Sequence, residues 1–113
     1  MEFDKESLIG LHVFWYPKAM TKKPPDLATI VRVFDGGCVN LDVVNGNGEH
    51  IFVDASYHVS RTDMLYDEAG RMLDHVPLSG AWELTPPARF VYDMMVASKE
   101  RQAAKKPKES AAV

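Results

Sequence analysis

A chain of 113 residues with 46% hydrophobic side chains has the size and composition of one domain with a packed core. Its formal net charge of −3 gives no general positive field that would attract nucleic acid. The single cysteine, Cys38, excludes a disulfide within the chain and predicts a reducing compartment. No basic leader segment and no run of about 18 apolar residues is present, so we expect a soluble, cytoplasmic protein.

The first part of the chain is typical of short strands separated by turns. The third strand alternates most regularly, with Val39, Leu41 and Val43 on one face and polar side chains between them. A closing strand near the end of this part places Trp82 on the core. The predicted strands cover residues 8–16, 27–34, 38–44, 50–59 and 78–84.

Two glycine clusters, Asp35-Gly36-Gly37 and Asn45-Gly46-Asn47-Gly48, raise the question of a phosphate-binding loop. Such a loop needs glycines that lead into a helix N-terminus, where free backbone N–H groups face the anion. Both clusters here lead into predicted strands, and neither is followed by Lys-Ser or Lys-Thr. Asn-Gly instead indicates a tight hairpin turn, because both central positions take positive φ. We therefore interpret both clusters as turns.

The segment from residue 60 to 80 fits two interpretations: a fifth hairpin closed by Gly70, or a single helical turn. After the closing strand, Thr85 is a favourable N-cap and Pro86 suits the first position of a helix. We predict an amphipathic helix over residues 85–106, ended by Pro107, and a disordered basic tail over 107–113. Residues 99–113 have a net charge of +3, which leaves −6 for the body of the chain.

Closely spaced strands joined by turns pair as antiparallel neighbours. A small, strongly twisted sheet protects its edges by curling into a barrel. The sequence therefore predicts a mainly β fold: a small antiparallel SH3-like barrel of about five strands over residues 1–84, followed by the C-terminal α-helix.

No residue pattern has the spacing of a catalytic or metal site. Cys38, at the start of a strand, is typical of a small packing residue, and no Ser/His/Asp pattern or glycine elbow accompanies it. The histidines lack the close spacing and additional cysteines of small metal sites. They are His12, His50, His58 and His75. We predict a non-enzymatic protein that uses no metal and no cofactor.

Candidate binding residues fall into three groups. The helix has an apolar stripe, which either covers the barrel or docks on another protein. Strand alternation favours a core position for Phe14 and Trp82, whereas Trp15 and Tyr16 flank a strand end and are candidate exposed aromatics. Arginines are candidate anion contacts, because arginine binds phosphate through two parallel hydrogen bonds. The stripe comprises Phe90, Val91, Met94 and Met95, and the arginines are Arg32, Arg61 and Arg71.

Two strand sequences, ATIVRV over 28–33 and CVNLDV over 38–43, are followed by a glycine turn, SRTDMLYDEAG and a late AWEL. This arrangement resembles small, uncharacterised proteins encoded by tailed bacteriophages. The resemblance covers residues 8–84 and implies a small β-barrel of phage or prophage origin. The helix after Thr85 is an addition to that pattern.

Together these observations favour a phage-encoded protein that acts through protein contacts or self-association, most simply as a virion-associated capsid or tail accessory subunit. It would then occupy the host cytoplasm or the virion, with no membrane partner. The alternative is an intracellular module that counters host defence by sequestering a protein or a nucleotide signal. Nucleic acid is the least favoured partner, because only the basic segment from Lys99 to Lys108 would attract it, in a salt-sensitive way.

Overall fold

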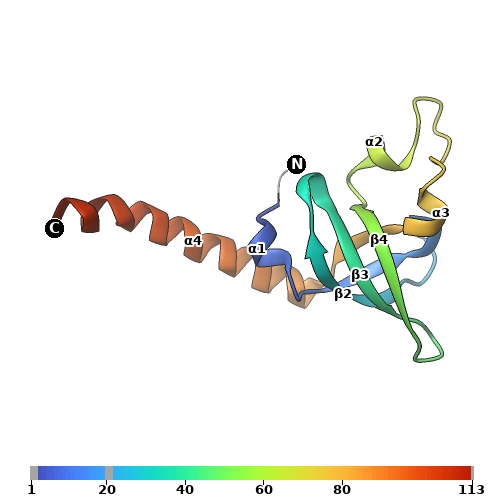
Figure 1. The fold of residues 1–113 in the computed structure, drawn as a ribbon, viewed down its shortest axis with the longest axis horizontal. Coiled ribbons are helices and arrows are strands. Elements are labelled where there is room, and N and C mark those ends of the chain that lie inside the picture. The colour runs from blue at the N-terminus through green and yellow to red at the C-terminus, as the bar shows by residue number, and fades with distance from the viewer. Residues whose placement is uncertain (1–2, 20–21, 113) are drawn as a thin grey trace.

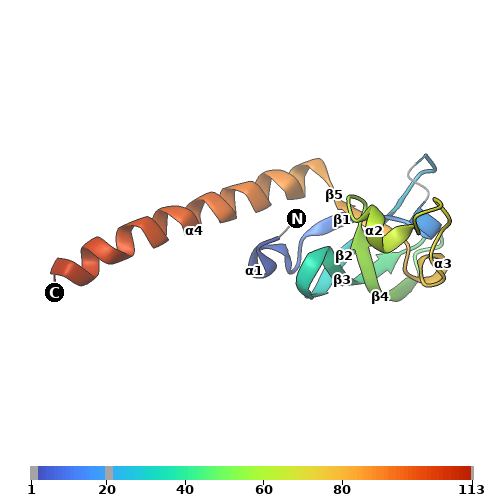
Figure 2. The same ribbon diagram turned by 90° about the horizontal axis from the view of Figure 1, so that it is seen from above.

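The fold was taken from a computed structural model that describes residues 3–19 and 22–112, with side chains up to residue 103. Five strands close into a barrel in the order β1-β2-β3-β4-β5, and a long C-terminal helix leads away from it (Figures 1 and 2). The predicted small SH3-like barrel with a C-terminal helix is confirmed. The strands are β1 (His12–Tyr16), β2 (Asp26–Val33), β3 (Cys38–Val44), β4 (His50–His58) and β5 (Ala81–Leu84).

Four pairings in the barrel are antiparallel: β1 with β2, β2 with β3, β3 with β4, and β1 with β5. The seam that closes the barrel differs from the prediction, because β4 and β5 are parallel there, with Tyr57 opposite Ala81 and His58 opposite Trp82. A parallel pair needs a crossover connection rather than a tight turn. Residues 59–80 provide it and include α2 (Thr62–Leu65) and α3 (Val76–Ser79), together with an isolated bridge between Tyr66 and Met72.

Two predicted strands begin later in the structure. The first begins at His12 because the residues before it form α1 (Lys5–Leu8), whose Leu8 is fully buried against the barrel core. The last begins at Ala81 because α3 and Gly80 precede it. Gly80 has φ of +59°, and a Cβ there would lie 2.5 Å from the carbonyl oxygen of Tyr16. Only glycine fits this close approach of two backbone segments.

The core lies inside the barrel and is built by strand alternation. Val39, Leu41 and Val43 are fully buried, as their shared face predicted. Trp82 is also fully buried, and its indole N–H donates a hydrogen bond of 3.0 Å to the carbonyl oxygen of Gly37. Phe14 is only partly buried, because its neighbours in β1 occupy the inward positions, so its predicted core position is wrong.

The helix α4 (Pro86–Ala112) begins at the predicted cap: the Thr85 hydroxyl accepts a hydrogen bond of 3.3 Å from the backbone N–H of Ala88. Its predicted end before Pro107 is wrong, since the helical backbone continues to Ala112. A proline removes one helical hydrogen bond and can kink a helix without ending it, and the Ala, Lys and Glu residues around it favour helix. Disorder was expected over residues 107–113. The side chains of these residues lie outside the described part of the structure, so that expectation stays a prediction.

Among the described residues, no helix combines sufficient length with a sufficiently apolar sequence to cross a membrane.

Candidate interaction surfaces

The first half of α4 is held against the N-terminal segment. The Tyr92 hydroxyl accepts a hydrogen bond of 2.9 Å from the backbone N–H of Asp4, and Lys99 forms ion pairs with Asp4 at 3.0 Å and Glu6 at 2.8 Å. The hydroxyl of Ser7, and then Lys99, lower the pKa of Asp4 by stabilising its charged form. These contacts fix the side of α4 that faces α1.

Within the apolar stripe of α4, Phe90 and Met94 lie on the side opposite to those contacts, whereas Val91 and Met95 lie beside them. Phe90 is 66% exposed and Met94 is 56% exposed, and Val91 and Met95 are exposed as well. The sequence left two interpretations of this stripe, burial on the barrel or docking on another protein. The stripe does not cover the barrel in this structure, and its four side chains remain accessible.

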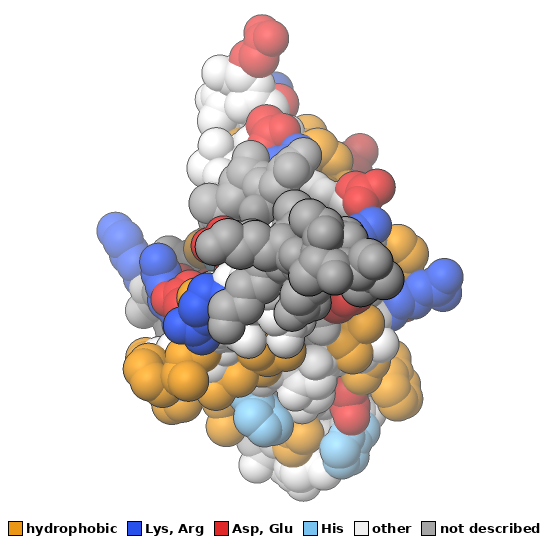
Figure 3. Space-filling view, turned by 90° about the vertical axis from the view of Figure 1, so that its left-hand side faces the viewer, with side chains coloured by type: hydrophobic (Ala, Val, Ile, Leu, Met, Phe, Trp, Pro, Cys, Tyr) orange, Lys and Arg blue, Asp and Glu red, His pale blue; other side chains and the backbone are white. Residues whose placement is uncertain are grey.

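A second exposed apolar surface lies on the outside of the barrel, and we call it the sheet face. It combines two cross-strand rows, in which Leu27 is paired with Val44 and Asp42 with Phe52. Leu27 is 58% exposed and Phe52 is 75% exposed. Viewed from the C-terminal side of α4, hydrophobic side chains gather on the barrel below the helix, with histidines among them (Figure 3). Exposed apolar groups concentrated in one place mark an interaction surface more often than scattered ones do.

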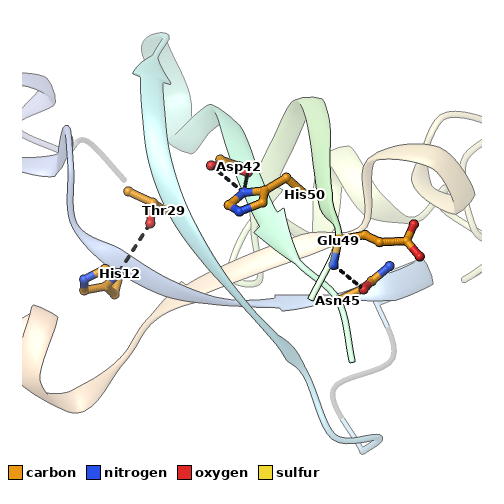
Figure 4. A network of polar contacts seen from close by, with 6 residues as sticks. All are labelled: His12, Thr29, Asp42, Asn45, Glu49 and His50. Atoms are coloured by element: carbon orange, nitrogen blue, oxygen red, sulfur yellow. Dashed lines mark hydrogen bonds and ion pairs between the residues drawn. The ribbon is translucent and has the colours of Figure 1, made fainter. Parts of the chain in front are cut away.

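Polar contacts organise the sheet face (Figure 4). The His50 Nδ1 atom lies 2.9 Å from a carboxylate oxygen of Asp42, and the His12 Nδ1 atom lies 3.4 Å from the Thr29 hydroxyl. At the hairpin end, the side-chain oxygen of Asn45 accepts hydrogen bonds from the backbone N–H groups of Asn47 and Glu49. Both glycine clusters therefore form turns between strands, as predicted.

The sequence did not single out the sheet face. The part of this surface that could have been predicted lies on β3, where Asp42 and Val44 occupy the positions that alternate with the buried ones. Their outward direction follows from period-two alternation. The exposure of Leu27 and Phe52 follows only from the register that pairs three strands. That register is set only when β2, β3 and β4 pair in the barrel.

The aromatic residues Trp15 and Tyr16, predicted as candidate exposed contacts, are buried: they are 9% and 7% exposed. Trp15 belongs to the barrel core, and Gly80, at the end of the crossover between β4 and β5, lies close to its ring. The indole N–H of Trp15 donates a hydrogen bond of 2.9 Å to the carbonyl oxygen of Ser79, and the Tyr16 hydroxyl donates one to the Glu83 carboxylate. Burial, together with the charge of Glu83, raises the pKa of Tyr16 to about 12.

The three arginines have different settings. Arg61 is paired with Asp63 at 2.9 Å, donates to the carbonyl oxygen of Gly36, and lies over the Tyr57 ring. Its proximity lowers the pKa of Asp63. Arg32 lies over the Phe34 ring at 5.1 Å, and Arg71 is exposed in the loop after α2. The structure thus places them on three separate segments, and Arg61 acts as a bridge between two turns.

Cys38 and the histidines were also placed by the structure. Cys38 is buried, and this burial raises the pKa of its thiol, which disfavours the reactive thiolate. Among the described residues, no three His, Cys, Asp or Glu side chains gather as metal ligands would. That no metal, cofactor or enzymatic activity is involved stays a prediction.

Comparisons with known proteins add no relative: no family model, no curated protein and no solved structure matches this chain. The resemblance of its strands to small phage proteins therefore stays a hypothesis.

Proposed function

We propose that this chain is a non-enzymatic subunit that binds another protein through the exposed stripe of α4. The observation that carries the proposal is the exposure of Phe90, Val91, Met94 and Met95 on α4, which packs on the barrel core through a different residue, Tyr92. Each square ångström of apolar surface left in water costs roughly 25 cal/mol, so a partner that covers the stripe gains stability. Methionine side chains suit such contacts, because they adapt to the shape of a partner.

The length of α4 supports the same proposal. The helix is anchored to the N-terminal segment as far as Lys99, and its second half leads away from the barrel (Figure 2). In proteins, most helical stability comes from packing one face against another element. A projecting helix is therefore suited to docking on a partner, while the barrel serves as a rigid base.

The assembly that we propose is a phage virion, in which the chain is a capsid or tail accessory subunit. The strand pattern over residues 28–43 that resembles phage proteins supports this choice. The barrel would present its turn at residues 45–49, and the helix would anchor it.

Virion incorporation of a double variant, Phe90→Ser with Met94→Ser, tests the proposal. Both side chains are exposed, so we expect an unchanged circular dichroism spectrum but at least a severalfold lower amount of the variant in virions of the encoding phage. Leu78→Ser is the matched control, because Leu78 is an exposed apolar residue on α3, outside the stripe. Equal incorporation of the double variant would contradict the role of the stripe, and absence of the wild-type chain from virions would remove the virion role.

Light scattering coupled to size-exclusion chromatography distinguishes the virion role from the intracellular alternative. The virion proposal predicts a peak without excess absorbance at 260 nm. A discrete oligomer that carries such absorbance would favour the module that sequesters a nucleotide signal.

A further inference from the structure

A small pocket lies between the barrel wall and the first turns of α4. Its volume is about 160 Å³. Four separate parts of the chain line it: the N-terminal segment, the end of β4, the end of β5, and α4. The residues that matter for its chemistry are Phe3, His58, Glu83, Arg89, Tyr92 and Asp93.

One side of the pocket is aromatic and held in place by several contacts. The Phe3 ring centroid lies 5.1 Å from that of His58, 5.5 Å from that of Trp82 and 6.1 Å from that of Tyr92. The Tyr92 hydroxyl is fixed by the backbone N–H of Asp4, and Trp82 is fully buried below. Aromatic rings in such a cluster attract cations through their negative faces.

His58 adds a neutral group to this side of the pocket. Its Nδ1 atom accepts a hydrogen bond of 3.1 Å from the backbone N–H of Ser60, so the proton of the neutral ring is on Nε2. Burial lowers the pKa of His58, and the nearby Arg89 lowers it further, whereas Glu83 raises it. The ring therefore places no positive charge in the pocket near neutral pH.

Among the described residues that line the pocket, the charged groups are two carboxylates, Glu83 and Asp93, and one guanidinium, Arg89. The Tyr16 hydroxyl donates a hydrogen bond to one oxygen of Glu83 and holds that carboxylate in place. With His58 neutral, the formal charges of these described residues sum to −1. A pocket with aromatic sides and an excess of one carboxylate is complementary to an organic cation.

We propose that this pocket binds a guanidinium or alkylammonium group, as presented by an arginine or lysine side chain of a protein or by a free small molecule of the same chemistry. The site is separate from the apolar stripe, because none of its residues belongs to the stripe. The proposal therefore does not depend on the function proposed above.

The test is a titration of the full chain with arginine blocked at both ends, N-acetyl-arginine amide, followed by NMR. We expect saturable shifts of the His58 ring proton and Trp82 indole N–H signals. The neutral isostere N-acetyl-citrulline amide should leave both signals in place. Equal shifts with the isostere, or no saturable shift with the cation, would overturn the proposal.

The proposal predicts that two variants change the dissociation constant in opposite directions. Asp93→Asn removes an attractive charge, and we expect binding to weaken by about threefold, as for a partly exposed ion pair. Arg89→Gln removes the opposing charge, and we expect binding to tighten by about threefold for the same reason. Glu100→Gln makes the same charge change as Asp93→Asn on an exposed part of α4 outside the pocket, and it should leave the constant unchanged. Weaker binding of the cation by Arg89→Gln would contradict the proposal.

A comparison of ligands identifies the source of the cation. A peptide with the sequence of residues 99–108 presents lysines from a chain like this one, and free arginine presents a small molecule. Tighter binding of the peptide than of blocked arginine would assign the site to a protein segment. Tighter binding of free arginine would assign it to a small molecule, and either result supports a cation site.

Discussion

The barrel and α4 place similar apolar side chains in opposite environments. Val39, Leu41 and Val43 of β3 are fully buried inside the closed barrel, whereas Phe90 and Met94 of α4 are exposed. Closure of the sheet buries one face of every strand. The helix is held by the N-terminal segment and packs on the barrel core through Tyr92, and its apolar stripe is left uncovered. The difference separates residues that stabilise this fold from residues that are available for a partner.

The largest effect expected from this comparison is that of Trp82→Ala. The change empties the centre of the core and removes the hydrogen bond to Gly37, so we expect a loss of about 3–5 kcal/mol in the free energy of unfolding. Urea denaturation measures it. The matched change on the helix, Phe90→Ala, should cost less than about 0.5 kcal/mol, because the side chain is exposed. Similar losses for both variants would show that the stripe is packed after all.

A pair of glycine variants distinguishes close backbone contact from backbone conformation alone. In Gly80→Ala the new Cβ would meet the Tyr16 carbonyl and the Trp15 ring, and we expect a loss of roughly 2–3 kcal/mol. Gly70 has a similar positive φ of 79° but nothing within 4 Å of an added Cβ. Gly70→Ala should therefore cost only about 1 kcal/mol in a denaturation experiment. Equal losses would mean that contact with β1 contributes nothing.

Thr85→Ala probes the junction between the two regions. The Thr85 hydroxyl caps α4 and also donates a hydrogen bond of 3.3 Å to the carbonyl oxygen of His12 in β1. We expect a loss of about 1 kcal/mol, with faster hydrogen exchange at the first turn of α4 and little change in β3. Thr85→Ser keeps the hydroxyl and serves as the control. Faster exchange throughout the barrel would show that the junction is part of the core.

The smallest effect concerns pH and His58. The folded state lowers the pKa of His58 below its ordinary value of 6.5, so the unfolded state binds the proton more readily. Stability is therefore highest above pH 6.5, where His58 is neutral in both states. It falls as the pH drops below 6.5, because the unfolded state takes up the proton first. Denaturation of the wild type at a series of pH values should show this slope, and His58→Gln should reduce it. His12→Gln, at an exposed position, should retain the slope.

Local patterns predicted those features in which neighbouring residues decide the structure. The alternation of β3, the Asn45 turn and the Thr85 cap all appear where the sequence placed them. One group of errors occurred where distant segments meet, and another came from a local rule. Trp15 and Tyr16 were expected at an exposed strand end, but both are buried, and their side chains bond to Ser79 and Glu83, more than 60 positions away. The end of α4 was placed at Pro107 on a local rule, and the helical backbone continues beyond it.

The candidate sites divide in the same way. The composition of the stripe on α4 could be predicted from the sequence, because four apolar residues recur at helical spacing. The exposure of the stripe could not be predicted, since it depends on the contacts of Tyr92 and Lys99 with the N-terminal segment. The cation pocket left no signal in the sequence, because it joins residues separated by up to 90 positions, from Phe3 to Asp93. Side-chain periodicity reports which faces are apolar, but only the packing of distant segments decides which of those faces become covered.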